Sequence, residues 1–200
     1  MKVKSACFVK SFTDPDAVHD LEPQICVAGR SNCGKSTLLN MLMGAKLCKT
    51  SQTPGRTRLI NVFRVEAEPM SFYFTDLPGY GFHSAQKAQA DDWSERTDRY
   101  FRNGKAIAQT LCLMDIRRDP SEHDKILINY LRDLEVPFTV VTTKADKLSR
   151  AQIGNAKIKI AAALGLARDN IIVTSSHNGS GKDALLDRIE NILAVRYVED

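Results

Sequence analysis

The feature that most constrains the fold of this 200-residue chain is Gly-Arg-Ser-Asn-Cys-Gly-Lys-Ser-Thr at residues 29–37. It fits the pattern G-x-x-x-x-G-K-[ST] and lies between a strand-like run (25–28) and a helix-like run (38–43). Loops of this kind hold phosphates with backbone N–H groups, and their glycines allow conformations that a Cβ would hinder. Lys35 adds charge for β and γ phosphates, and the Ser36 hydroxyl is placed to bind Mg²⁺. The segment predicts a strand–loop–helix unit built around an anion.

Strand-like and helix-like segments alternate along the whole chain. Strands are predicted at 3–12, 24–29, 59–66, 70–75, 107–115, 136–142 and 170–174, the third and fourth close enough to pair antiparallel. Helices are predicted before Gly44, near 91–101, after the capping sequence 121–124, from 149 to Gly165 and after 180–183. The prediction is a three-layer α/β fold with a mainly parallel sheet, one antiparallel strand, and helices on both faces. We expect one domain over 1–200, with a leading strand and connector at 1–23.

The cysteines and the apolar runs indicate where such a protein works. Five cysteines occur without a C-x-x-C pair, so neither a disulfide framework nor a zinc site is predicted; Cys26 and Cys112 lie in apolar runs and should be core residues. No apolar run approaches the roughly 18 residues that a membrane-spanning helix needs. The N-terminus lacks a signal or transit pattern. We expect a soluble, cytoplasmic monomer without membrane contacts.

The net charge of +4 is modest, but it is unevenly distributed. Residues 45–65 contain no acidic residue and five basic ones: Lys46, Lys49, Arg56, Arg58 and Arg64. An electropositive surface beside a phosphate site can bind RNA or attract phosphate. The alternative is an ordinary solvated basic loop.

Four chemically suggestive segments follow predicted strands: 29–36, 76–79, 143–146 and 174–176. Ligands of open α/β sheets bind at the carboxyl ends of the strands, so these segments are expected to share one edge. The alternative, that 29–37 is a glycine-containing turn matching by chance, does not account for this shared placement.

Asp76-Leu77-Pro78-Gly79 has the residues that a metal and a terminal phosphate require. A carboxylate can lie near Mg²⁺, and a glycine N–H can reach the γ phosphate only when that phosphate is present. Thr57, in the loop before the strand at 59–66, can add a hydroxyl ligand for Mg²⁺; it can equally be a plain turn residue.

Thr143-Lys144-Ala145-Asp146 indicates which base is bound. A carboxylate accepts hydrogen bonds from both N1–H and the 2-amino group of guanine, whereas adenine presents an acceptor at N1 and no 2-amino group. Asp146 therefore predicts GTP. The aliphatic stem of Lys144 can cover one face of the base. Backbone N–H groups around Ser175 and Ser176 are then available for guanine O6.

Together these motifs resemble the EngB family of ribosome-assembly GTPases, within the translation-factor class of P-loop GTPases. The matching segments are 29–36, Thr-Pro-Gly-Arg-Thr at 53–57, Asp-Leu-Pro-Gly-Tyr-Gly at 76–81, Asp115-x-Arg117 and 143–146. The resemblance places the Mg²⁺ ligands on Ser36 and Thr57. Two departures from the wider GTPase pattern occur. Thr143 replaces an asparagine whose amide braces the base loop, and Tyr80 stands where many GTPases have a water-orienting glutamine, which implies slow intrinsic hydrolysis.

The complete predicted site unites these segments. Lys35, Thr57 and Asn32 are the expected catalytic residues, Asp76 a Mg²⁺ ligand, either directly or through water, and Asn32 a candidate K⁺ ligand. Bound GTP or GDP is expected to contact Gly29, Arg30, Ser31, Asn32, Cys33, Gly34, Lys35, Ser36, Thr37, Gly55, Arg56, Thr57, Asp76, Leu77, Pro78, Gly79, Thr143, Lys144, Ala145, Asp146, Thr174, Ser175 and Ser176. We also expect the phosphate-loop N–H groups to favour a Cys33 thiolate.

The predicted function is hydrolysis of GTP to GDP and phosphate by a Mg²⁺-dependent switch. The resemblance implies that its partners are the large ribosomal subunit precursor and rRNA, and that cell division (septation) depends on it. One alternative is a binding module that hydrolyses GTP negligibly. Another is a GTP-dependent scaffold that acts on division proteins or a membrane surface rather than RNA; the absence of a lipidation motif or amphipathic tail counts against the membrane.

Overall fold

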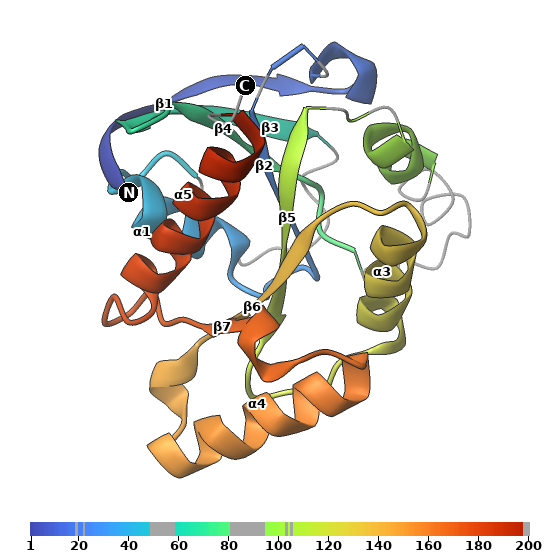
Figure 1. The fold of residues 1–200 in the computed structure, drawn as a ribbon, viewed down its shortest axis with the longest axis vertical. Helices are drawn as coiled ribbons and strands as arrows, with labels where there is room; N and C mark the ends of the chain where they lie inside the picture. The colour runs from blue at the N-terminus through green and yellow to red at the C-terminus, as the bar shows by residue number, and fades with distance from the viewer. Residues whose placement is uncertain are drawn as a thin grey trace.

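The computed structural model describes residues 1–18, 20–21, 23–48, 59–80, 95–102, 104 and 106–197. Within them, seven strands form one sheet in the order β1-β3-β4-β2-β5-β6-β7 (Figure 1). The strands are β1 (Lys2–Phe12), β2 (Gln24–Gly29), β3 (Ile60–Glu68), β4 (Phe72–Asp76), β5 (Ile107–Asp115), β6 (Phe138–Thr143) and β7 (Ile171–Val173). Every residue of β2 and β5, which are neighbours near the middle of the sheet, is buried.

The strand directions confirm the predicted sheet. β4, β2, β5, β6 and β7 are parallel to one another along the sheet. β3 is antiparallel to both of its neighbours, β1 and β4. Among the strands that the structure describes, β3 is therefore the one that runs opposite to the rest.

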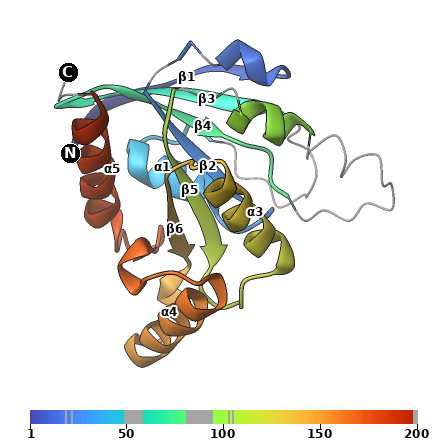
Figure 2. The ribbon, with the colours of Figure 1, turned by 45° about the vertical axis from the view of Figure 1, so that its right-hand side comes forward.

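Helices cover both faces of the sheet, which gives the predicted three layers (Figure 2). They are α1 (Lys35–Met43), a helical segment at 95–102, α3 (Glu122–Asp133), α4 (Arg150–Leu164) and α5 (Lys182–Tyr197). Apolar side chains of α1 and α5 pack into one core cluster, and those of 95–102, α3 and α4 pack into a second. None of the helices in the described ranges is long and apolar enough to cross a membrane.

Four of the predicted helix ends are also confirmed, at Gly44, Ser121, Ser149 and Gly165. Ser121 Oγ accepts from the Asp124 N–H at 3.3 Å while Asp124 Oδ2 accepts from the Ser121 N–H at 2.7 Å, which completes a capping box before α3. α4 begins with the same reciprocal pattern at Ser149. α1 and α4 end at Gly44 and Gly165, whose φ angles of 66° and 60° lie in the left-handed region.

The parallel strands bring their carboxyl ends to one edge of the sheet. Asp76, Gly29, Asp115 and Thr143 are the last residues of β4, β2, β5 and β6, and Thr174 directly follows β7. The topology therefore gathers the segments singled out in the sequence, in the described part of the chain, at a single edge.

Candidate nucleotide site

The phosphate loop at 29–37 leads from the buried end of β2 into α1. Its backbone is tightly curled, because Asn32 and Gly34 have φ angles of 62° and 108°. A Cβ on Gly29 would lie 2.7 Å from the Leu113 carbonyl oxygen and 2.8 Å from Cys33 Sγ. A larger residue at 29 or 34 would therefore clash or strain the loop, which explains the two glycines of the motif.

The segment after β4 lies directly against the phosphate loop. The Ser31 N–H donates to the Tyr80 carbonyl at 3.1 Å. A Cβ on Gly79 would come within 2.7 Å of Ser31 Oγ and 2.9 Å of Lys35 Nζ. A side chain at 79 would displace Ser31 Oγ and the Lys35 ammonium group, so glycine keeps residue 79 beside the lysine that is expected to bind the β and γ phosphates.

Asp76 has the properties of a cation ligand. It is buried, and its Oδ1 has no hydrogen-bond partner within the described residues. Burial raises the pKa of its carboxyl to about 6, although Lys35 opposes the shift. A buried carboxylate oxygen without a partner suits a hard cation such as Mg²⁺, and Ser36 at the start of α1 offers a hydroxyl. The described donors thus fit the metal that the sequence predicts.

Thr143 corrects one expectation about the base loop. From the sequence, the replacement of asparagine by Thr143 implies that the base loop loses a stabilising side-chain hydrogen bond. Instead its hydroxyl donates to the Cys33 carbonyl at 2.5 Å, with the Met114 carbonyl oxygen at 3.3 Å. Thr143 is buried, so this short hydroxyl contact is shielded from water. A hydroxyl therefore ties the base loop to the phosphate loop where the wider GTPase pattern uses an amide.

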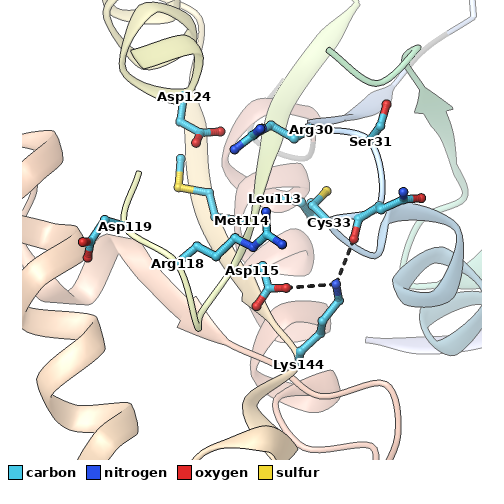
Figure 3. A pocket seen from close by; sticks show the side chains of 11 residues that line it. Arg30, Ser31, Cys33, Leu113, Met114, Asp115, Arg118, Asp119, Asp124 and Lys144 are labelled. Atoms are coloured by element: carbon cyan, nitrogen blue, oxygen red, sulfur yellow. Dashed lines mark hydrogen bonds and ion pairs between the residues drawn. The ribbon is translucent and has the colours of Figure 1, made fainter. Parts of the chain in front are cut away.

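Lys144 makes the second connection between the two loops (Figure 3). Its Nζ donates to the Asn32 carbonyl at 2.8 Å and to Asp115 Oδ2 at 2.9 Å. Lys144 itself has a φ of 63°, which turns the chain sharply at the end of β6. Its ammonium group thus fixes the phosphate loop.

Asp115 is a site residue whose role sequence reasoning missed. Asp115-x-Arg117 stands in the sequence only as part of a resemblance, yet Arg117 donates to Asp115 Oδ1 at 2.9 Å from Nε and to Oδ2 at 2.6 Å. Burial opposes ionisation of Asp115, but hydrogen bonds from Arg117 and Lys144 outweigh it and hold the pKa well below its usual range. In the sequence, the one signal of this ion pair is an acidic and a basic residue, Asp115 and Arg117, two positions apart at the end of a predicted strand. The carboxylate anchors Lys144.

The residues expected to recognise guanine lie together, with one difference from expectation. Asp146 Oδ1 accepts from Ser175 Oγ at 2.6 Å, and this bond is the main cause that lowers the pKa of Asp146. The Ser175 N–H, expected to face guanine O6, donates instead to the Ser180 carbonyl at 3.0 Å. Thr174 is buried, and its hydroxyl donates a hydrogen bond to the Thr142 carbonyl at 2.9 Å. Ser175 therefore orients Asp146 through its side chain.

The Tyr80 side chain packs in the core. The ring is buried, and its hydroxyl donates to Asp124 Oδ1 at 2.7 Å at the start of α3. Burial raises the pKa of Tyr80 well above its ordinary value. Its side chain is thus committed to the core.

Cys33 contradicts the expectation of a thiolate. Only 5% of the residue is exposed, and the thiol packs in the core cluster that contains α1. Burial is the largest influence and raises the pKa of the thiol, although Lys35 opposes it. Position in a phosphate loop does not activate a side chain that points inward.

A pocket of about 220 Å³ lies between the phosphate loop, the end of β5 and the start of α3 (Figure 3). Arg30 and Asp124 both line this pocket, with the Arg30 side chain drawn on the Asp124 side of the phosphate loop. The pocket walls also include Arg118 and Asp119. Gly55, Arg56, Thr57 and the basic residues Lys49 and Arg58 lie outside the described residues.

Three comparisons bear on this arrangement. A family model described as "50S ribosome-binding GTPase" matches residues 24–144. The chain is 41% identical over 201 residues to the "Probable GTP-binding protein EngB" of Geobacter metallireducens, covering 100% of this chain and 97% of that protein. The crystal structure of a probable GTP-binding protein EngB is similar at a TM-score of 0.69 and 25% identity, covering 86% of this chain and 100% of that one.

A further solved structure extends the likeness. Era in complex with MgGDPNP and a segment of 16S ribosomal RNA is similar at a TM-score of 0.67 and 26% identity, covering 86% of this chain and 56% of that one. Full-length similarity to an EngB protein, the family match over more than half of the sequence and the shared fold agree with the geometry of the two loops. The chain is a P-loop GTPase and belongs to the EngB family of GTP-binding proteins.

Proposed function

We propose that the protein binds GTP with Mg²⁺, hydrolyses it through the residues described above, and acts as a switch in assembly of the large ribosomal subunit. The observation that supports this most is the double connection between loops. Thr143 and Lys144 donate to the carbonyls of Cys33 and Asn32, so the loop that carries Asp146 is fixed relative to the phosphate loop. A fixed spacing between the two loops suits a single nucleotide that contacts both.

Catalysis in this proposal is mainly positioning and charge stabilisation, with water attacking the γ phosphate in line. Lys35 presents its ammonium group to the β and γ phosphates, and the Gly79 N–H, packed close to Lys35, donates to the γ phosphate. Mg²⁺, when bound, neutralises charge on these phosphates; Ser36 and Asp76 would hold it, with Thr57 as a further proposed ligand. Each of these groups acts on charge that grows during bond cleavage.

Single-turnover hydrolysis of GTP by the purified protein tests this proposal. We expect Mg²⁺-dependent formation of GDP that Lys35→Ala reduces by roughly 10²-fold or more. The rival function, a module that uses GTP as a structural ligand, is favoured by the burial of Tyr80, since a buried ring cannot orient water. GTP binding without hydrolysis in a single turnover would support that rival.

Asn32 has a proposed role in compensating for the missing glutamine. Its side chain is exposed, while its carbonyl is used by Lys144. A side-chain oxygen at this position can help to hold K⁺ beside the β and γ phosphates. We expect faster hydrolysis in K⁺ than in Na⁺ at equal ionic strength, and loss of that difference in Asn32→Ala with little change in GDP affinity. Equal wild-type rates in the two salts would remove this role.

The ribosomal partner is supported by the family description, which names 50S ribosome-binding GTPases, and by the similar fold of Era, solved with ribosomal RNA. Dependence of cell division on the protein would follow from a defect in ribosome supply. Sedimentation with ribosomal particles tests the partner: we expect association with precursors of the large subunit under a GTP analogue and release under GDP. Identical sedimentation in both nucleotides would contradict a switch.

A further inference from the structure

α4 and the turns that flank it form a stretch of the described chain that carries basic residues and no acidic ones. Residues 147–168 contain no aspartate or glutamate. The same stretch carries five basic residues: Lys147, Arg150, Lys157, Lys159 and Arg168. A helix whose surroundings bear one sign of charge produces a local positive potential that attracts anions.

Most of these cations also have no ionic partner in the part of the chain that the structure describes. Lys147 pairs with Asp146 at 3.2 Å, but no carboxylate or other acceptor contacts the side chains of Arg150, Lys157, Lys159 or Arg168 within the described residues. Cations elsewhere are commonly neutralised, as by the ion pairs Lys4–Glu68, Arg64–Glu66, Arg102–Asp98 and Lys125–Glu122. The charge of α4 is therefore available to an external partner.

The helix has one buried face and one outward face. Ile160, Ala161 and Leu164 pack into the core. Gln152, Asn155, Ile158 and Lys159 are exposed, and Ile158 is 48% exposed. Figure 1 shows α4 along the outside of the molecule at the end of the sheet that carries β7. Its 15 residues span about 22 Å, which is long enough to follow several phosphates of a nucleic acid strand.

α3 adds to this surface at the end of α4. Arg132 donates to the Leu164 carbonyl at 2.7 Å and to the Gly165 carbonyl at 2.9 Å. These bonds neutralise the partial negative charge at the carboxyl end of the helix. The whole length of α4 thus remains favourable for anions.

We propose that the outward face of α4 binds the phosphate backbone of RNA. This inference rests on the proposed ribosomal function and names the surface that would meet the RNA. Unpaired lysines and arginines along a helix supply phosphate contacts, and the exposed amides of Gln152 and Asn155 can donate to phosphate or 2′-hydroxyl oxygens. A membrane surface fits poorly, because Ile158 is the one large apolar side chain exposed on the described helix.

The test compares two double variants of the full chain that remove the same amount of charge. Lys157→Gln with Lys159→Gln removes cations of α4, whereas Lys4→Gln with Lys125→Gln removes ion-paired cations elsewhere. Binding of a fluorescein-labelled RNA hairpin is measured by anisotropy from 50 to 200 mM KCl. Binding of a fluorescent GDP analogue is measured in parallel. Glutamine keeps helix propensity, and circular dichroism checks the fold of each variant.

We expect the α4 variant to bind RNA about 10-fold more weakly at 50 mM KCl, with a slope of log affinity against log salt reduced by about 0.7–0.9 for each phosphate that is no longer neutralised. The control variant should change by less than about twofold, and both should bind the GDP analogue normally. Equal weakening in the two variants would overturn the inference, since net charge alone would then explain binding. Competition by poly-glutamate as strong as by unlabelled RNA would overturn it in favour of an acidic protein partner.

Failure of this inference is separable from failure of the proposed function. Normal wild-type RNA binding that is insensitive to the α4 substitutions would place the RNA elsewhere on the protein and leave the ribosomal function standing. Absence of RNA binding by the wild-type protein at 50 mM KCl would contradict both the surface and the RNA partner. GTP hydrolysis is measured separately and depends on neither result.

Discussion

The base loop and the segment after β4 meet the same phosphate loop in different ways. Thr143 and Lys144 connect the base loop to it through side-chain hydrogen bonds whose donors and acceptors are all satisfied by protein groups. Asp76 lies at the same edge, but its buried Oδ1 has no partner in the described residues. The difference teaches that the base-recognition half is held in place by bonds between protein groups. The catalytic half contains a buried carboxylate oxygen that no described protein group satisfies, which suits a cation ligand.

The largest change should come from Asp146→Asn, which removes base recognition while leaving both loops connected. An amide presents a donor where the carboxylate accepted from guanine, so GTP affinity should fall by roughly 10²–10³-fold and preference should shift toward xanthine nucleotides. Titration with GTP and XTP measures this shift. Unchanged GTP affinity would show that guanine is recognised elsewhere.

Thr143→Val should break the connection itself. The Cys33 carbonyl loses its hydroxyl donor in a buried site, so we expect a decrease of about 1–3 kcal/mol in the free energy of unfolding, together with weaker nucleotide binding. Thr143→Ser keeps the hydroxyl and should retain nucleotide affinity, although it loses a methyl group. Denaturant unfolding and nucleotide titration of both variants measure these effects. Equal nucleotide affinity in valine and serine variants would mean that the hydroxyl is not a brace.

Asp76→Asn should increase the stability of the protein, whereas Thr143→Val should decrease it. The buried carboxylate is disfavoured by desolvation, so its neutral isostere should raise the unfolding free energy of the nucleotide-free protein by about 1 kcal/mol, or roughly 2–4 °C in Tm. The same variant should lose stabilisation by Mg²⁺ with nucleotide. Thermal melts with and without Mg²⁺·GDP measure both effects. Lower stability without nucleotide would indicate that the carboxylate already has a stabilising partner.

Asp115→Asn should have the smallest effect, because its two partners are partly exposed. We expect a decrease of about 0.5–1 kcal/mol in the free energy of unfolding near neutral pH. The folded-state pKa of Asp115 is depressed, so its contribution is present above the unfolded value near pH 4 and is lost as pH falls further. The stability difference between wild type and variant should shrink below about pH 4. A difference that grows on acidification would contradict this ionic role.

Local patterns in the sequence were sufficient for the framework. β2 and β5 have the predicted bounds because largely apolar runs are buried on both faces, and the capping box at Ser121 depends only on residues three apart. The shared edge of Asp76, Asp115 and Thr143 follows from parallel strand order. Such features depend on near neighbours or on general topology.

The sequence did not show which way several side chains point, because their orientation depends on the tertiary structure. Whether Cys33 faces ligand or core depends on the curl of the phosphate loop against Leu113, which no spacing encodes. The same holds for Tyr80, which reaches Asp124 across 44 residues, and for Lys144, which reaches Asp115 across 29. The Ser175 N–H was misassigned because the turn that ends at Ser180 uses it first. These contacts join segments whose relative orientation only the fold defines.

The central claim is that Asp146, oriented by Ser175, makes this a guanine site, and a comparison of GTP with ATP tests it most directly. Calorimetric titration of the purified protein with each nucleotide in Mg²⁺ gives the two dissociation constants under one condition. The account predicts that GTP binds on the order of 10³-fold more tightly than ATP or better, because Asp146 would be left unpaired by adenine. Comparable affinities for GTP and ATP would contradict it.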